Sequence, residues 1–556
     1  MFIRQIIRLI PATQRKQGIW ITISTVLQAL LNMAGLTVII PLIVLIFDPD
    51  QLVNYPFFVS HRSLIVIAII GFIVGKNLLI IWLSNIRIRY INKLYRYYSE
   101  KLYESYYQQG LLFIKDKHSD KLAYNTNTVC YLFTHGTLSL TLSMISEILL
   151  LLFIWGGIFW FSPIVALCIV ACLLPFAIIY LYWFRTKLMK YGKEENEAKR
   201  RIMTLVGDTF RGYPDIKLND AYPWFKKRFD TSISQIAYCR EWITCSLQIP
   251  QGMIEVYVII GMILFIIIGG DDNETRLTLG ILTVAVLRML PSLRSLITKA
   301  TQWKNNAFTI ETIENINEIK QGKDELSLIY FREQLKLDGI GFCYPEKDSF
   351  TIKNFSLNIN KGECIGIQGV SGIGKTTLFN LLLGFYTPQE GEIRIDNLLL
   401  NEQTCAAWQR LIAYVPQDIF IMDATLSENI ALGIEEIDNE RIMLAIEQSG
   451  LKDYVSSLPN GIYSRIGQNG NFLSGGERQR VGIARALYKK AEVLFFDEPT
   501  SSLDSKKEKE ILDTIYKLSV SEAHLTIVII SHKHSTLAFC NRIVDTNTSL
   551  QLNEIL

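Results

Sequence analysis

The chain has 556 residues, 49% of them hydrophobic, and a formal net charge of +3. This length calls for more than one domain, and the apolar residues, concentrated before residue 300, exclude a wholly water-soluble protein. The small net charge gives no argument for a nucleic-acid partner, because the positive residues are better explained as cytosolic flanks of membrane spans.

Six apolar segments in the first half are long enough to cross a hydrocarbon core of roughly 30 Å. We place the crossings at residues 19–47, 63–85, 138–161, 164–184, 247–268 and 279–296. The long connections 87–136 and 185–241 are rich in Lys and Arg, whereas the short link 271–276 is mostly acidic. By the positive-inside bias, the long connections and both termini are cytoplasmic in a multi-pass protein of the cell (inner) membrane.

Several polar residues interrupt these apolar segments, and a central charge in lipid costs roughly 3 kcal/mol. We therefore expect Lys76, Glu147, Glu255 and Arg288 to face protein or a wet cavity. Polar residues recur on the sixth segment at spacings of four and three, at Arg288, Ser292, Ser295, Lys299 and Gln302. This stripe lies on one helical face and, with Lys76, predicts a substrate cavity. The alternative is an interhelical hydrogen-bond seam, or snorkelling toward the cytosol.

The composition changes at residues 315–334, which are charged and lack a long apolar run. We interpret them as a linker between a membrane domain (1–314) and a soluble domain (335–556). The expected fold is multidomain, with an all-α transmembrane six-helix domain followed by a soluble domain.

The soluble half contains a sequence typical of a phosphate-binding loop. A strand at 364–368 is followed by Gly-Val-Ser-Gly-Ile-Gly-Lys-Thr-Thr and then by an apolar helix, the context that supports a complete P-loop. Backbone N–H groups surround the phosphates, the Lys375 ammonium group offsets the negative charge of the β- and γ-phosphates, and the Thr376 hydroxyl binds Mg²⁺. The ATP-binding residues expected here are Gly369, Ser371, Gly372, Gly374, Lys375, Thr376 and Thr377.

An acidic pair ends a second strand. The apolar run 493–496 predicts a strand buried on both faces of a parallel sheet, with Asp497 and Glu498 at its carboxyl end. One carboxylate there can hold Mg²⁺ through water while the next orients or deprotonates the attacking water. Taken by itself, the pair also fits an ordinary helix start.

Upstream, Leu473-Ser474-Gly475-Gly476-Glu477 stands before a helix with an apolar stripe. Two glycines there leave backbone N–H groups free at the positive end of the helix, which favours phosphate binding. A serine–glycine turn that merely caps the helix is the alternative.

Together these motifs resemble the ATP-binding cassette (ABC) family, whose signature LSGGQ is matched with Glu477 in place of the final Gln. The resemblance implies that the soluble domain is an α/β P-loop ATPase domain with a helical subdomain. It implies ATP and Mg²⁺ as cofactors, and ATP hydrolysis coupled to transport. It also implies that Ser474, Gly475 and Gly476 complete the ATP site of the opposite subunit, so that the protein is a homodimer with two shared sites.

The resemblance assigns further roles outside the P-loop. It implies adenine stacking for Tyr344, contact with Mg²⁺ and water for Gln417, contact with the γ-phosphate for His532, and a place at the dimer interface for Asp504. Asp497 is then a Mg²⁺ ligand through water, and Glu498, with His532 and Gln417, is catalytic. A packing tyrosine, an ordinary loop glutamine and a structural histidine are the alternatives.

The outline of the membrane half resembles the exporter type of this family, which ends each long inner connection in a short coupling helix. We expect these near residues 118–128 and 219–229. One departure is Gln468, where such exporters usually carry a glutamate in the loop assigned to coupling.

Among exporters, Ser146-Glu147 and residues 287–292 look like the bacterial flippase of lipid-linked oligosaccharides, although the first outer link is shorter here. The favoured hypothesis is a flippase or exporter that moves an amphipathic, anionic lipid-linked substrate from the cytosolic side by alternating access, in contact with membrane lipids. A peptide or drug exporter is the runner-up. A non-transporting ATPase is disfavoured by the six spans, and a membrane-embedded regulator remains a further alternative.

Overall fold

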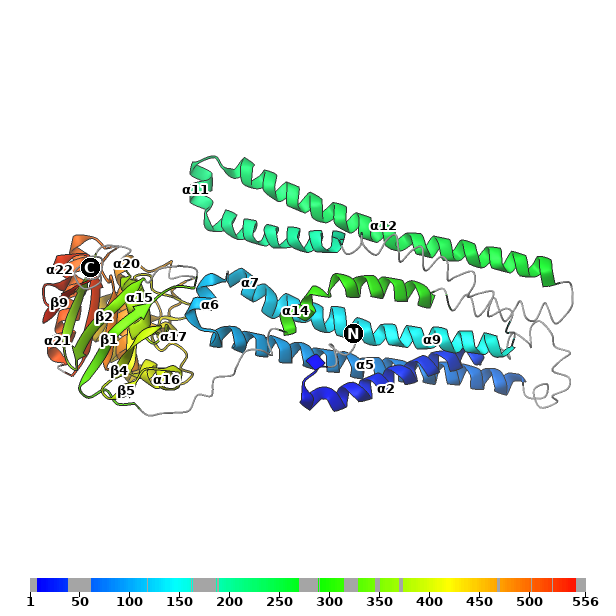
Figure 1. The fold of residues 1–556 in the computed structure, drawn as a ribbon, viewed down its shortest axis with the longest axis horizontal. Coiled ribbons are helices and arrows are strands. Elements are labelled where there is room, and N and C mark those ends of the chain that lie inside the picture. The colour runs from blue at the N-terminus through cyan, green and yellow to red at the C-terminus, as the bar shows by residue number, and fades with distance from the viewer. Residues whose placement is uncertain are drawn as a thin grey trace. The chain divides into compact units, whose positions relative to one another are not determined.

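A computed structural model describes most of the chain. The described residues are 8–38, 62–117, 119–161, 163, 187, 190–269, 289, 291–314, 329–345, 351–369, 374–467, 471–501, 503–522 and 524–546. The chain divides into two units, Met1–Gln109 with Phe113–Lys320, and Gly110–Leu112 with Gln321–Leu556. The first is helical and the second has an α/β architecture (Figure 1).

Long helices dominate the N-terminal half (Figure 1). They and the shorter helices between them are α2 (Ala12–Thr37), α5 (Arg62–Gln108), α6 (Gly110–Asp116), α7 (Ser119–Tyr124), α8 (Cys130–Phe133), α9 (Ser139–Phe161), α11 (Tyr213–Leu218), α12 (Tyr222–Gly269) and α14 (Phe308–Glu314), with further helical stretches at 190–211 and 291–305. Two π-helical turns, η2 (Asn125–Val129) and η3 (Thr134–Leu138), make α7 to α9 one continuous helical path.

The helical unit is held by contacts between helices far apart in sequence. Helix α2 packs against α5 and α9 (Figure 1). The buried Tyr98 hydroxyl of α5 donates to the backbone oxygen of Leu9 at 2.7 Å, which satisfies the phenol inside an apolar cluster around Phe133. Stretch 190–211 lies beside α12, where the Tyr191 and Trp242 ring centroids are 4.5 Å apart.

Three described helical stretches are long and apolar enough to cross a membrane: Ala12–Gly35, Ile67–Gln108 and Ser119–Trp160. They overlap the first three predicted crossings, and the predicted crossing 247–268 lies within α12. The predicted crossing 164–184 and most of 279–296 lie outside the described residues, so the count of six rests on the sequence.

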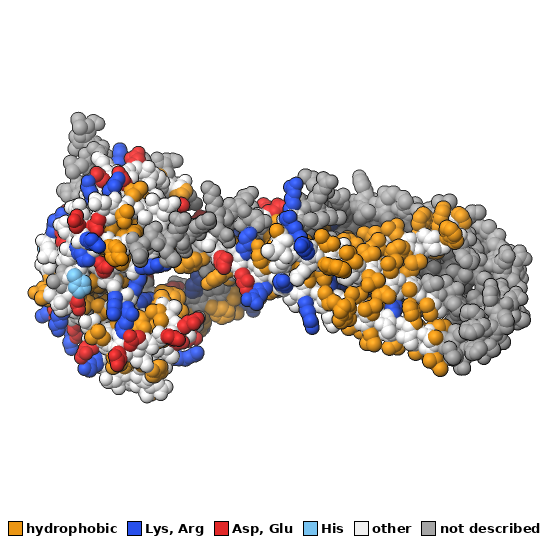
Figure 2. Space-filling view, turned by 90° about the horizontal axis from the view of Figure 1, so that it is seen from below, with side chains coloured by type: hydrophobic (Ala, Val, Ile, Leu, Met, Phe, Trp, Pro, Cys, Tyr) orange, Lys and Arg blue, Asp and Glu red, His pale blue; other side chains and the backbone are white. Residues whose placement is uncertain are grey.

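The apolar part of α5 stands almost entirely free of the rest of the unit, since 6% of its most apolar window is buried. Its exposed large apolar side chains include Ile67, Ile70, Val74, Leu78, Ile81 and Trp82. Hydrophobic side chains cover much of the visible face of the long helices in Figure 2. Such a surface is stable against lipid tails and unfavourable in water.

The short helices of the inner connections correct one prediction. Residues 118–128 were expected to form a coupling helix, and α7 covers Ser119–Tyr124 of that range. Residues 219–229 were expected to form the second, but the short helix there is α11, Tyr213–Leu218, and Tyr222 already begins α12. A proline in the first turn starts each of these helices, Pro214 in α11 and Pro223 in α12, because proline suits an N-terminal helical position.

The described residues of the ATPase unit form two sheets. The antiparallel sheet has the order β2 (Ile352–Asn360), β1 (Gln334–Phe342), β4 (Glu390–Ile395), β5 (Leu398–Leu399). The parallel sheet has the order β6 (Ile412–Val415), β7 (Val493–Asp497), β8 (Thr526–Ser531), β3 (Cys364–Gln368), β9 (Arg542–Asp545). Every pairing in the second sheet is parallel, as the apolar run 493–496 predicted.

Helices connect and cover these strands. They are α15 (Lys375–Leu382), α16 (Glu402–Leu411), α17 (Leu426–Ile430), α18 (Asn439–Ser449), α19 (Lys452–Ser457), α20 (Gly475–Lys489), α21 (Ser505–Ser521) and α22 (His534–Leu537), with a 3₁₀ turn η5 (Gly461–Tyr463). One apolar core joins the two sheets through Phe379 and Trp408, and a second includes Ile511 of α21 and Phe496 of β7. A third, formed by α17 to α20 around Ile446, is the helical subdomain.

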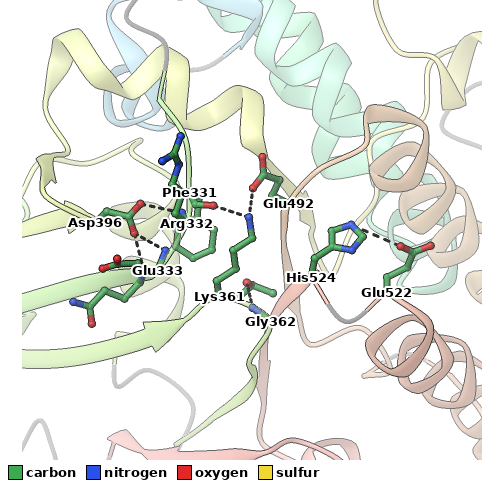
Figure 3. Close-up of polar contacts among 11 residues, drawn as sticks. Phe331, Arg332, Glu333, Lys361, Gly362, Asp396, Glu492, Glu522 and His524 are labelled. Atoms are coloured by element: carbon green, nitrogen blue, oxygen red, sulfur yellow. Dashed lines mark hydrogen bonds and ion pairs between the residues drawn. The ribbon is translucent and has the colours of Figure 1, made fainter.

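Hydrogen bonds hold residues 331–334, at the start of the described ATPase unit, in place (Figure 3). The Asp396 carboxylate accepts backbone N–H groups of Arg332, Glu333 and Gln334 at 2.9, 2.9 and 2.8 Å. Partial burial acts to raise the pKa of Asp396, but these three donors and the charge of Lys361 outweigh it and lower the pKa. Lys361 also donates to the backbone oxygen of Phe331 at 2.6 Å.

Asp396→Ala is expected to loosen this attachment, because one charged acceptor serves three N–H groups. We expect the free energy that protects these amides to fall by about 1–2 kcal/mol. Hydrogen exchange of the peptide containing residues 332–334 in the purified protein measures it. Asp338→Ala removes an exposed carboxylate paired with nearby Lys336 and is the control. Equal exchange in both variants would contradict the role of Asp396.

The lowered pKa fixes the pH dependence of the same attachment. A carboxyl group whose pKa is lower in the folded state than in the unfolded state stabilises the folded state at pH values above its unfolded pKa. That contribution is lost as the pH falls through the pKa of the folded state. The difference in protection between wild type and Asp396→Ala should therefore persist at neutral pH and vanish below the ordinary carboxyl range.

Candidate functional site

The carboxyl ends of the parallel strands collect the predicted ATP-site residues at one edge of the sheet. The P-loop follows β3, Asp497 and Glu498 end β7, His532 follows β8, and Gln417 follows β6. Because these four strands are mutually parallel, the loops that follow them lie along the same side. Residues separated by more than a hundred positions thus share one edge.

The described part of the P-loop has the geometry that phosphate binding needs. Gly374, the N-cap of α15, has φ +105°, and a Cβ there would lie 3.2 Å from the Thr351 backbone oxygen. Lys375 is buried, and its Nζ donates to the Gly369 backbone oxygen at 2.6 Å. Ser371 and Gly372 lie outside the described residues.

The two threonines of α15 face different surroundings. Thr376 is exposed, so its hydroxyl is accessible to solvent and to a metal ion. Thr377 is buried, and its hydroxyl is 2.9 Å from that of Tyr344. Tyr344 also meets Phe342 and Tyr386 edge to face, which is the packing role stated above as its alternative. The prediction that Tyr344 stacks on adenine is left untested by these contacts.

Glu498 and His532 lie together at the ends of β7 and β8. His532 Nδ1 is 3.2 Å from Glu498 Oε1. The Glu498 N–H donates to the Ile530 backbone oxygen at 2.9 Å, while its φ of +47° turns the chain out of the strand. A left-handed conformation at a glutamate costs free energy, and such residues concentrate at functional sites. The side chain is 19% exposed, so it is held against the protein yet reachable.

Asp497 has a partner that the sequence did not identify. The Tyr414 hydroxyl on neighbouring β6 donates to Asp497 Oδ2 at 3.1 Å. Burial, and then the adjacent carboxylate, raise the pKa of Tyr414, so the phenol stays protonated and continues to donate. The parallel register pairs Tyr414 with Phe495, two residues before Asp497 on β7, so this contact depends on β6 lying beside β7.

The signature segment begins α20 with a reciprocal cap. The Glu477 N–H donates to Ser474 Oγ at 3.4 Å, and the Ser474 N–H donates to Glu477 Oε2 at 2.6 Å. Glu477, the departure from the family's signature, therefore closes a capping box. N–H groups in a first helical turn lack intrahelical acceptors, so those of Gly475 and Gly476 point outward from the helix end.

Two further contacts position the predicted loops. Gln479, one turn into α20, donates through Nε2 to the Gln417 backbone oxygen at 2.8 Å, which ties the signature helix to the loop after β6. Asp504 caps α21 and accepts the Lys507 N–H at 3.0 Å. That N–H is the main cause of the lowered pKa of Asp504, so the side chain is ionised at neutral pH.

The residues present suit a nucleotide with Mg²⁺. Hydroxyl, amide and carboxylate oxygens from Thr376, Gln417 and Asp497 are hard ligands that Mg²⁺ prefers. Among the described residues no group of three or more His, Cys, Asp or Glu could hold a metal ion. That is compatible with Mg²⁺, which usually keeps several waters and is shared with substrate phosphates.

The predicted cavity residues in the membrane half fall into separate settings. Ser295 Oγ and Lys299 Nζ both donate to Glu147 Oε1, at 3.0 and 3.1 Å. For these two, the structure matches the interhelical hydrogen-bond seam given above as the alternative. Ser292 is buried on the same stretch.

Lys76 lies elsewhere, since a Cβ on Gly35 of α2 would be 2.7 Å from its Nζ. Arg288 and the Glu255 side chain lie outside the described residues. The cavity itself therefore remains a prediction.

Comparisons with known proteins identify the family. A family model of the ABC transporter matches residues 352–501. A probable ABC transporter ATP-binding/permease protein of Haemophilus influenzae is 27% identical over 545 residues, covering 92% of this chain and 94% of the relative. Relatives named ATP-dependent lipid A-core flippase include that of Bordetella avium, 29% identical over 73% of this chain and 68% of its own length. That of Cupriavidus metallidurans is 31% identical over 68% of this chain and 64% of its own length.

The fold has a close structural match. The structure of a bacterial Atm1-family ABC exporter with ATP bound aligns with TM-score 0.77 and 21% identity, over 96% of this chain and 94% of that one. The chain belongs to the ABC transporters. It is an ATP-driven exporter in which a helical membrane region is fused to an α/β ABC ATPase domain, which confirms the expected fold class and family.

Glu498→Gln is expected to retain ATP binding and to lose roughly 10²-fold or more in ATPase turnover, because an amide cannot accept the proton of water. Turnover and nucleotide affinity of the purified protein measure the two effects. Glu436→Gln, at an exposed position of the helical subdomain, controls for the substitution itself. Near-normal turnover in Glu498→Gln would remove this residue from catalysis.

Proposed function

We propose that two identical copies of this chain form a flippase that moves an anionic, lipid-linked oligosaccharide from the cytosolic leaflet by alternating access. Both termini lie on the cytoplasmic side of the cell (inner) membrane. The observation that carries the ATPase part is the shared sheet edge, where Lys375, Glu498 and His532 follow parallel strands. The names of the lipid A-core flippase relatives support a lipid carrying sugar and acidic groups.

The residues at this edge have separate roles in the proposal. Mg²⁺-bound ATP supplies the phosphoryl bond whose cleavage drives transport. The P-loop N–H groups and Lys375 bind its phosphates, while Thr376, Gln417 and Asp497 hold the metal ion directly or through water. Glu498 orients or deprotonates the attacking water.

Two residues complete this arrangement. His532, 3.2 Å from Glu498, positions the carboxylate and contacts the γ-phosphate. Tyr414 keeps Asp497 oriented.

The dimer follows from the signature segment. The helix start at Ser474 offers outward N–H groups and the positive end of α20, which suits a phosphate. We propose that this phosphate belongs to ATP bound by the partner subunit, with Asp504 at the same interface. ATP binding then draws the two ATPase domains together, and hydrolysis releases them.

Completion of each ATP site by the signature segment of the other subunit, here called trans completion, predicts that two heterodimers differ in the number of intact sites. Lys375→Ala in one subunit and Ser474→Arg in the other should place both lesions in one composite site and leave the second intact. Both changes in one subunit should damage both sites. The measured quantity is the number of ATP molecules occluded per dimer, expected to be one in the first arrangement and none in the second. No difference between the arrangements would exclude trans completion.

Substrate charge is tested by ATP-dependent flipping in vesicles. A cationic cavity would pair with an acidic head group through charge-assisted bonds, while the acyl tail stays in the bilayer. We expect a polyprenyl-pyrophosphate glycan to be preferred over a neutral glycolipid and a cationic dye, and Arg288→Ala to abolish that preference. Arg294→Ala removes an exposed charge six residues along the same segment and is the control. A preference for the cationic dye would contradict the proposal.

A further inference from the structure

A single carboxylate oxygen joins two membrane-half helices at one point. Glu147 comes from α9, and Ser295 and Lys299 come from the helical stretch 291–305. Both donors converge on Glu147 Oε1, at 3.0 Å from Ser295 Oγ and 3.1 Å from Lys299 Nζ. The Lys299 side chain is 25% exposed and that of Glu147 is 21% exposed, so the pair is largely covered but reachable.

The stability of the fold gives little reason for an ion pair within a membrane span. Glu147 lies inside the candidate membrane span Ser119–Trp160. Removing two charges from water costs several kcal/mol per ion, and apolar replacements of similar size are often neutral or stabilising. Ionisable residues inside membrane spans therefore point to function and to the partner they face.

The two helices have other contacts that hold them together. Trp303 Nε1 donates to Thr141 Oγ1 at 3.0 Å, and Asn306 Nδ2 donates to the Gly136 backbone oxygen at 3.2 Å. A Cβ at Gly136 would collide with Asn306 Nδ2, so the helices meet closely there. Both of these contacts are neutral, whereas the contact between Lys299 and Glu147 is charged.

We propose that Glu147 is an exchangeable counter-ion, which neutralises Lys299 in the absence of substrate and is displaced when the phosphate of an anionic lipid pairs with Lys299. This inference rests on the proposed flippase function and adds a specificity-determining residue to it. Exchange keeps the Lys299 ammonium paired in both states, and the displaced Glu147 carboxylate keeps the Ser295 hydroxyl as a donor. A neutral lipid cannot replace the carboxylate, so the pair also excludes neutral cargo.

The proposal has a quantitative consequence. An apparent dissociation constant equals the intrinsic one divided by the fraction of competent protein. If the pair is closed in about nine of ten molecules, removing the carboxylate should strengthen binding of the anionic lipid about tenfold. Removing Lys299 should weaken it.

The test uses the full-length protein in nanodiscs, with ATPase stimulation as the readout. The lipids are a polyprenyl pyrophosphate, the corresponding monophosphate and the uncharged polyprenol, and a lipid A preparation serves as a second anionic lipid. Glu147→Gln should lower the half-stimulating concentration of the pyrophosphate about tenfold and leave the response to polyprenol unchanged. Lys299→Gln should raise that concentration. The double charge reversal, Glu147→Lys with Lys299→Glu, restores a pair and should return the response toward wild type.

Thr141→Val is the matched control, because it breaks a neutral hydrogen bond between the same two helices. An equal shift in Thr141→Val and Glu147→Gln would reduce the effect to loosened packing and overturn the proposal. If the anionic lipid stimulates the wild type and Glu147→Gln leaves the half-stimulating concentration unchanged, the counter-ion role of Glu147 is overturned while the flippase function stands. If no anionic lipid stimulates the wild type, the proposed substrate and the counter-ion both fail.

Discussion

The parallel pairing of five strands is the constraint on which the ATPase half depends. Strands that run the same way need long crossovers, and those crossovers carry the helices that cover the sheet. Because the carboxyl ends coincide, short loops from β3, β6, β7 and β8 meet without any of them being close in sequence. The apolar strands fix the positions of the ATP-site residues, and the polar residues of the site lie where each strand ends.

In the membrane half the corresponding constraint is the cost of polar groups in lipid. It allows the exposed apolar face of α5, and it favours partners for polar side chains inside the unit. The seam from Asn306 to Ser295 shows how this is met, because hydroxyl, indole, amide and ammonium donors from one helix meet acceptors on another. An apolar surface suited to lipid and a seam of paired polar groups therefore occur in the same helical unit.

The sequence predicted those features whose signal is local. The P-loop and its flanking strand and helix were readable because glycine, lysine and threonine at this fixed spacing, between a strand and a helix, are specific to phosphate-binding loops. The Asp497–Tyr414 contact was not readable, since it depends on the order of strands in the sheet. Which carboxylate pairs with Lys299 was left open by the sequence, because that choice depends on helix packing. The second short inner helix was placed too late in the chain, although Pro214, a residue that suits the first helical turn, lies at its start.

The strand that precedes the P-loop also sets the order in which the domain can be built. Cys364 to Gln368 have β8 on one side and β9 on the other, at residues 526–531 and 542–545. During synthesis this strand has neither neighbour until residues 526–545 have emerged from the ribosome. Contacts so distant in sequence slow folding and leave apolar strand edges open to aggregation. Completion of the nucleotide-binding edge therefore waits for strands far downstream of the P-loop, and loss of β8 and β9 would leave the P-loop without the sheet that holds it.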